Sequence, residues 1–121
     1  MPLLRRTPPP DADGFYQTGI PAGEITAESL TRVKVSGQVV LLTRSGDSLV
    51  AFSSICPHAA ADLSKGRFVR GQVKCPDHGY TFDVRTGRPT WPEDEVCRLK
   101  RFTAVEEAGL VKIRLTAPEG R

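Results

Sequence analysis

Short runs of alternating apolar and polar residues mark strands in the first half of the chain. Three such runs cover residues 31–35, 38–44 and 48–53. The residues between them are Ser, Gly and Asp, which are typical of the tight turns of antiparallel hairpins. The pattern predicts a three-stranded meander with one buried face, formed by Val33, Val35, Val39 and Leu41.

The second half of the chain predicts further short strands and no long helix. A hairpin is expected from strands at residues 67–69 and 72–74, and residues 80–84 continue from it as an extended segment. Two closing strands are expected over residues 95–106 and 110–115. No segment has the apolar period of an amphipathic helix. The sequence therefore predicts an all-β protein built from antiparallel strands.

The N-terminal stretch differs in composition from the rest of the chain. Residues 1–14 are rich in Pro and end in polar residues, which predicts a flexible arm, and residues 15–118 are expected to form one domain. No apolar run is long enough to predict a membrane-spanning helix. Arg5-Arg6 is followed by a polar, Pro-rich stretch, so no signal peptide is expected.

Candidate chemistry is concentrated between residues 56 and 78. Cys56-Pro57-His58 is followed after sixteen residues by Cys75-Pro76-Asp77-His78-Gly79. Two thiolates and two imidazoles suit either one tetrahedral zinc ion or a two-iron, two-sulfide cluster with the cysteines on one iron and the histidines on the other. Zinc modules more often pair like with like, whereas each pair here mixes one sulfur with one nitrogen. The spacing favours the cluster and leaves zinc as the alternative.

The Cys-x-His and Cys-x-x-His-Gly segments resemble those of the Rieske iron–sulfur family. The resemblance continues through Tyr80-Thr81-Phe82-Asp83 and the turn at residues 85–88, and it covers roughly residues 16–116. It implies a Rieske-type fold, in which an antiparallel β base domain carries an inserted cluster-binding subdomain of two metal loops and a short hairpin. That subdomain would be residues 54–92. The resemblance also implies that a proline-containing loop, here residues 87–92, covers the cluster from a third side.

The resemblance implies a role for each of the four residues. Cys56 and Cys75 would hold the inner iron of one Rieske-type 2Fe-2S cluster, and His58 and His78 would hold the outer iron near solvent. High-potential respiratory members carry two further loop cysteines and a serine after the second His-Gly. This chain has no such cysteines, and Tyr80 stands at the serine position. Fewer hydrogen bonds to cluster sulfur lower the reduction potential, so the chain resembles the low-potential, oxygenase-associated branch.

The charge distribution bears on the partners. The 17 Lys and Arg residues exceed the 14 Asp and Glu residues, but they are scattered and not interleaved with aromatics, so nucleic-acid binding is not expected. The exposed edge of the cluster at His58 and His78 is called the histidine edge, and a basic rim for an acidic redox partner is predicted around it. The rim consists of Lys65, Arg67, Arg85 and Arg88, with Trp91 as an apolar anchor. Cys97 lies outside the motif and is expected to be a small buried residue on a strand. A lone extra cysteine of this kind suits a reducing cytoplasm.

The predicted function is that of a Rieske ferredoxin, which carries one electron from a flavin-dependent NAD(P)H reductase to a terminal oxygenase such as a dioxygenase. The chain has no Gly-x-Gly-x-x-Gly motif, so the reductase would be a separate protein. No catalytic site is expected in the chain itself. An oxygenase iron needs two histidines besides those of the cluster, and the chain has two in all. The alternative is a small Rieske subunit of a larger oxidoreductase such as nitrite reductase. No membrane partner is expected, and the sequence leaves the oligomeric state open.

Overall fold

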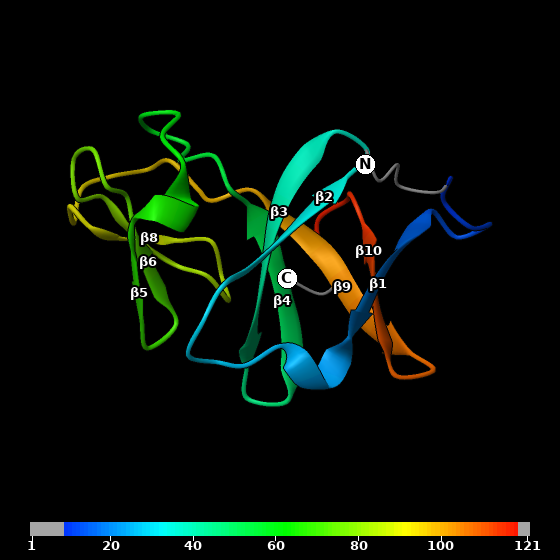
Figure 1. Ribbon diagram of the computed structural model, residues 1–121. Coiled ribbons are helices and arrows are strands. Elements are labelled where there is room, and N and C mark those ends of the chain that lie inside the picture. The colour runs from blue at the N-terminus through cyan, green and yellow to red at the C-terminus, as the bar shows by residue number, and fades with distance from the viewer. Residues whose placement is uncertain (1–8, 119–121) are drawn as a thin grey trace, which may run out of the picture.

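The structure is a computed structural model that describes residues 9–118. Almost half of the chain is strand, and the helical content is limited to single turns (Figure 1). No helix in the described part is long and apolar enough to cross a membrane. The elements are β1 (Phe15–Pro21), η1 (Ala22–Glu24), β2 (Thr31–Val35), β3 (Gln38–Ser45), β4 (Ser48–Ser53), η2 (Leu63–Lys65), β5 (Arg67–Val69), β6 (Gln72–Lys74), β7 (Thr81–Asp83), β8 (Pro89–Trp91), β9 (Arg101–Glu107) and β10 (Leu110–Arg114). The all-β prediction is confirmed.

The larger sheet has six antiparallel strands in the order β1-β10-β9-β4-β3-β2. Two-residue turns close its β2–β3 and β9–β10 hairpins, at Ser36-Gly37 and Ala108-Gly109. In both turns the two residues have positive φ, from 50° to 84°. Turns of this kind match the right-handed twist of the flanking strands, and glycine takes the second position without a steric cost. The predicted meander of β2, β3 and β4 is confirmed.

Both faces of β3 are buried, which differs from the predicted meander with a single buried face. Val33 pairs with Val40 across the β2–β3 ladder, so Val33 and Val35 share a face with Val40 and Leu42 rather than with Leu41. Leu41 lies on the opposite face and packs in a different core. The alternation on β2 correctly predicts its buried face, but it does not reveal that a second layer of the protein covers the other side of β3.

The second layer is a small sheet with the strand order β5-β6-β7-β8. Figure 1 shows it set to one side of the six-stranded sheet. The β5–β6 turn at Arg70-Gly71 has positive φ at both residues, like the hairpin turns of the larger sheet. One core joins the two layers; its buried members are Leu41, Val50, Phe52, Cys56, Leu63, Val73, Cys75, Phe82, Val84 and Leu99.

Two segments differ from the prediction. Residues 89–91, expected within a covering loop, form β8 at the edge of the small sheet, where a proline is tolerated because the strand has only one neighbour. Residues 95–100, expected to be strand, cross from the small sheet to the larger one without pairing as a strand, and β9 begins at Arg101. Val96 on this crossing is 84% exposed, so its apolar side chain marks no core position.

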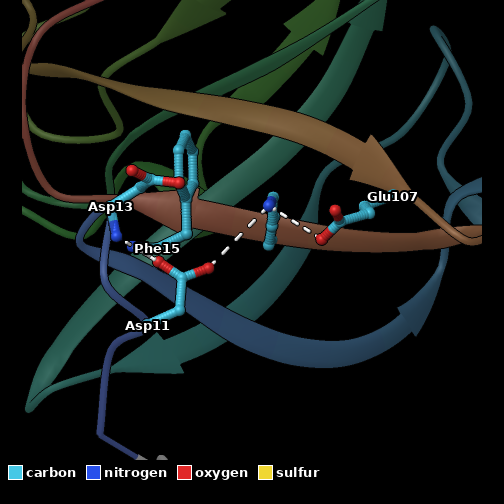
Figure 2. A network of polar contacts seen from close by, with 5 residues as sticks. Asp11, Asp13, Phe15 and Glu107 are labelled. Carbon is cyan, nitrogen blue, oxygen red and sulfur yellow. Dashed lines mark hydrogen bonds and ion pairs between the residues drawn. The ribbon is translucent and has the colours of Figure 1, made fainter.

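The chain before β1 is hydrogen-bonded to the domain from Asp11 onward. The backbone N–H groups of Asp13 and Phe15 donate to Asp11 Oδ1 over 2.9 and 3.0 Å, and Lys112 Nζ lies 3.8 Å from Asp11 Oδ2 (Figure 2). Lys112 also contacts Glu107 at 2.8 Å and lies over the ring of Phe15. Residues 1–8 of the predicted arm lie outside the described residues. Hydrogen bonds and an ion pair therefore connect the chain to the domain from Asp11 onward, and the domain start at residue 15 stays a prediction.

Candidate metal centre

Two loops with the same backbone hydrogen bonds carry the four candidate ligands. In the loop after β4, the N–H of Cys56 donates to the Ala61 carbonyl and the N–H of Ala60 donates to the Cys56 carbonyl, both over 2.9 Å. In the loop between β6 and β7, Cys75 stands in the same relation to Tyr80 and Gly79, over 2.7 and 3.1 Å. Each loop thus turns sharply after its cysteine.

The fourth residue after each cysteine completes this turn in a left-handed conformation. Ala60 has φ 57° and Gly79 has φ 77°. Glycine adopts this conformation freely, whereas alanine is strained there. The His-Gly dipeptide at residues 78–79 is therefore partly a requirement of loop geometry.

The two cysteines lie together in the core that joins the sheets. Each is 1% exposed. Burial raises the pKa of the Cys56 thiol, and the neighbouring Cys75 thiol raises it further. Phe52, Leu63 and Phe82 are fully buried members of the same core. Two thiols at this position would face a metal from the protein side.

The two histidines lie together at the surface. Both side chains are exposed, and their ring centroids are 5.6 Å apart with the planes at 79°. Tyr80 stacks on His58 at 3.8 Å and 13°, and Trp91 meets the edge of Tyr80 at 6.2 Å. The donor set is therefore divided into a buried sulfur pair and an exposed nitrogen pair.

A third segment, residues 92–97, approaches the histidine side. Glu95 Oε2 accepts hydrogen bonds from the N–H groups of Val96 and Cys97 over 2.9 and 2.8 Å. These bonds, the Cys97 thiol and His58 lower the pKa of Glu95. Partial burial and the carboxylates of Glu95 and Asp94 raise the pKa of Tyr80. This acidic segment was not predicted; its signal in the sequence is the run Glu93-Asp94-Glu95 directly after Pro92.

Cys97 lies on this segment and not on a strand, which corrects the prediction. Its side chain is partly exposed and hydrogen-bonds to Glu95. That bond and burial raise the pKa of the Cys97 thiol. The prediction failed because the apolar residues near Cys97 belong to a crossing segment that packs through Leu99 alone.

The predicted basic rim is divided in the structure. Lys65 and Arg67 border a hollow of about 300 Å³ beside Cys75, together with Lys74. Arg85 and Arg88 lie in the turn between β7 and β8, at the end of that hairpin opposite Tyr80 and Trp91. Strands rise about 3.3 Å per residue, so a hairpin of three-residue strands separates its two ends by roughly 10 Å. The acidic residues 93–95 thus flank the histidine edge on the side of His58. Lys65, Arg67 and Lys74 lie beside the second ligand loop, at Cys75.

The arrangement fits a two-metal centre with unlike ends. Cysteine sulfurs on the inside and histidine nitrogens on the outside match the ligand division of a Rieske centre, in which each iron takes one kind of ligand. In residues 9–118 no group of three or more His, Cys, Asp or Glu side chains is arranged to hold a metal ion, so the division into two pairs is what the structure shows.

The comparison with protein families agrees with the fold and the motif. A family model described as the Rieske [2Fe-2S] domain matches residues 17–103. The chain belongs to the Rieske [2Fe-2S] domain family. This membership implies one Rieske-type 2Fe-2S cluster as the cofactor.

Similar proteins include ferredoxin components of oxygenase systems. The anthranilate 1,2-dioxygenase ferredoxin subunit of Burkholderia cepacia is 42% identical over 57 residues, which are 46% of this chain and 53% of that subunit. The chain spans about half the length, or less, of the first curated relatives it matches.

Two solved structures share the fold over most of both chains. The ferredoxin of carbazole 1,9a-dioxygenase from Nocardioides aromaticivorans IC177 is 31% identical with a TM-score of 0.69, covering 81% of this chain and 94% of that one. A chain in the complex of reduced oxygenase and oxidised ferredoxin of carbazole 1,9a-dioxygenase is 26% identical with a TM-score of 0.74, covering 87% and 96%. The chain therefore has the fold of a Rieske ferredoxin.

Proposed function

We propose that this protein is a Rieske ferredoxin that carries one electron from a flavin-dependent NAD(P)H reductase to a terminal oxygenase. The observation that carries the proposal is the division of the candidate ligands into a buried thiol pair and an exposed imidazole pair. Exposed ligands give a partner a short route to the centre, whereas the thiols are screened by the core. The similarity to ferredoxin components of dioxygenase systems supports the same role.

In this proposal Cys56 and Cys75 hold one iron and His58 and His78 hold the other. The cluster, when bound, supplies a reversible one-electron couple whose potential is raised by the neutral imidazoles relative to four thiolates. The chain's own residues position the ligands. Tyr80 supports the plane of His58, and the paired backbone hydrogen bonds of the two loops hold Cys56 and Cys75 in place.

The partner and domain assignments belong to the same proposal. The complex of oxygenase and ferredoxin known for carbazole 1,9a-dioxygenase supports docking to an oxygenase. The exposed imidazoles of His58 and His78 are the reason to place that contact at the histidine edge. A separate reductase follows from the lack of a dinucleotide-binding motif in the sequence. Residues 54–92 act as the cluster-binding subdomain of a domain over residues 15–118. A partly exposed free thiol at Cys97 suits a cytoplasmic location.

The test is spectroscopic and kinetic. Protein purified without oxygen is expected to contain two irons per chain, to absorb visible light, and to give a Rieske paramagnetic resonance signal on one-electron reduction. It should then be reoxidised by an oxygenase of the aromatic-ring-hydroxylating type. Zinc in place of iron in native protein would exclude the carrier role. Stable co-purification with a large reductase subunit would replace it with the role of a bound Rieske subunit.

A further inference from the structure

An arginine cluster lies at the end of the β7–β8 hairpin away from the ligand loops. Two of its members come from the turn between β7 and β8, one comes from the segment that leads into β9, and one is the first residue of β9. Three of the four side chains are exposed, and Arg101 is partly buried. The members of this cluster are Arg85, Arg88, Arg98 and Arg101.

Hydrogen bonds hold the turn and the segment together. The N–H of Leu99 donates to the Gly87 carbonyl over 2.9 Å, and Arg101 Nε donates to the Val84 carbonyl over 3.2 Å. Gly87 has φ 81°, and a Cβ there would lie 2.9 Å from the Leu99 carbonyl oxygen. The contact therefore requires glycine at this position, and it fixes the backbone that presents the four arginines.

The arginine cluster borders two adjoining hollows of about 290 and 470 Å³. The hollows share Thr86, Arg101 and Pro118 as lining residues. Apolar side chains such as Leu49 and Leu99 line them between the charged groups. The surface thus combines guanidinium groups with apolar contact area over an extended depression.

The positive charge of this surface is not neutralised within the described residues. The ion pairs found in residues 9–118 both involve Lys112 and none of the four arginines. Asp83 is the nearby carboxylate, but its Oδ1 already accepts the N–H groups of Arg85 and Thr86. Burial lowers the pKa of Arg101; Asp83 raises it, and Arg85 lowers it by less than Asp83 raises it. A negatively charged occupant would pair with the exposed guanidinium groups of Arg85, Arg88 and Arg98, which form no ion pair among the described residues.

We propose that the arginine cluster binds an acidic segment of a partner protein, at a place separate from the histidine edge. Arginine pairs with carboxylates through two parallel hydrogen bonds, and the apolar lining suits the side chains between them. Single-stranded nucleic acid would need exposed aromatic stacking surfaces, and the aromatic residue that lines these hollows, Phe102, is only 2% exposed. The inference rests on the proposed carrier function for its purpose: a partner anchored here leaves the histidine edge free.

A peptide of alternating Glu and Leu, with a far-red label, is the probe. Binding to the cluster-loaded protein is measured by fluorescence anisotropy at about 10 mM and about 1 M salt, where the screening length falls from about 30 to 3 Å. The double variant Arg88→Glu/Arg98→Glu is compared with Lys65→Glu/Arg67→Glu, which makes the same change in net charge beside Cys75. A peptide of alternating Gln and Leu is the uncharged control.

The expected result is a loss of affinity of about tenfold or more in Arg88→Glu/Arg98→Glu at low salt, against less than about twofold in Lys65→Glu/Arg67→Glu. Equal losses in the two variants would reduce the effect to net charge and overturn the proposal, as would no loss in either. Displacement of the peptide by inorganic pyrophosphate at a lower concentration than by free glutamate would assign the surface to phosphate instead. Tighter binding in Glu119→Gln would identify the chain's own C-terminal segment as the occupant.

The same samples separate this proposal from the proposed function. If reduced protein lacks the Rieske resonance signal while peptide binding still depends on Arg88 and Arg98, the carrier function fails and the acidic-segment site stands. If the signal is present and unchanged in the variants while binding is insensitive to them, only the acidic-segment site fails.

Discussion

Tyr80 is the residue at which the parts of the candidate metal centre meet. Its carbonyl accepts the N–H of Cys75, its ring stacks on His58, and Trp91 meets its edge. It thus connects both ligand loops, since Cys75 belongs to one and His58 to the other. A stacked ring of this kind restricts the orientation of an exposed imidazole that would otherwise turn freely.

Replacing a ligand should remove the cluster signature outright. His78→Ala deletes one of two nitrogen donors, so we expect the visible absorption and the Rieske resonance signal to be lost, since the outer iron would have an incomplete ligand set. His58→Cys should also abolish the Rieske signal, because it replaces a neutral donor by a charged one. Iron content and both spectra are the measurements.

Cys97→Ser is the matched control for the ligand variants. Cys97 hydrogen-bonds to Glu95 and lies outside the two ligand loops, so its hydroxyl replacement should keep both spectra. A bleached Cys97→Ser protein, or a His78→Ala protein with an intact signal, would show that the ligands are assigned wrongly.

Asp11 should make the folded state more stable at neutral than at acidic pH. The N–H of Phe15 first, and then the N–H of Asp13 and the charge of Lys112, lower the pKa of this carboxyl. A carboxyl with a lowered folded pKa stabilises the protein above its unfolded pKa, and this stabilisation is lost as pH falls through the folded pKa. Asp11→Asn should therefore have a lower Tm than the native protein at about pH 7 and the same Tm at about pH 2.

Asp13→Asn makes the same charge change and serves as the comparison. The Asp13 carboxylate accepts no hydrogen bond among the described residues, so its loss should lower Tm less than the loss of Asp11 at neutral pH. Thermal unfolding followed by circular dichroism measures both variants. A Tm difference for Asp11→Asn that persists at low pH would mean that the charge of Asp11 is not responsible.

At the scale of elements, the first ligand loop is held against β6 by a glycine. Gly66 ends η2, and its N–H donates to the Leu63 carbonyl over 3.1 Å. A Cβ on Gly66 would lie well inside contact distance of the Lys74 carbonyl oxygen, and Lys74 directly precedes Cys75. The close approach of these two backbones fixes the spacing between the two ligand loops.

Gly66→Ala should therefore be severely destabilising. The added methyl group meets backbone rather than a flexible side chain, so β6 or the first loop must move, at a cost of about 3 kcal/mol or more. Gly23→Ala is the control, because a Cβ at Gly23 meets nothing within 4 Å and its φ is not positive. That change should leave the free energy of unfolding within about 1 kcal/mol of native. Urea unfolding distinguishes the two, and equal effects would contradict the close contact.

At the scale of the whole molecule, β3 separates two cores. Leu41 faces the core that contains Cys56 and Cys75, which is called the thiol core. Leu42 faces a second core, which is enclosed by the larger sheet. Both leucines are fully buried. Neighbours in sequence thus support different parts of the protein.

The two leucines should differ in their effect on the cluster but not on stability. Leu41→Ala and Leu42→Ala should each lower the free energy of unfolding by about 2–5 kcal/mol, because each leaves a cavity. Only Leu41→Ala should also shorten the lifetime of the cluster in folded protein, since its cavity adjoins the thiol core. The rate of bleaching at a temperature where both variants remain folded is the measurement. Equal bleaching rates would show that the cores do not act separately.

The sequence by itself determined the local structure and the candidate ligands. Glycine at the second position of the turns at residues 36–37, 70–71 and 108–109 adopts the left-handed conformation of such turns at no steric cost, and the alternation on β2 indicates one buried face, so these hairpins were predictable. Cys56, His58, Cys75 and His78 are adjacent to turn-forming residues at fixed short spacing, which is why their motif was visible without a fold.

Only the tertiary structure decided how these pieces meet. Burial of both faces of β3, the division of the basic residues between the two ends of the β7–β8 hairpin, and the approach of Glu95 to His58 all depend on contacts between segments far apart in sequence. Periodicity reports which face of a strand is buried but not which layer covers it. The order of charged residues in the sequence does not report their positions in space, because a hairpin brings residues that are far apart in sequence back to the same end of a sheet.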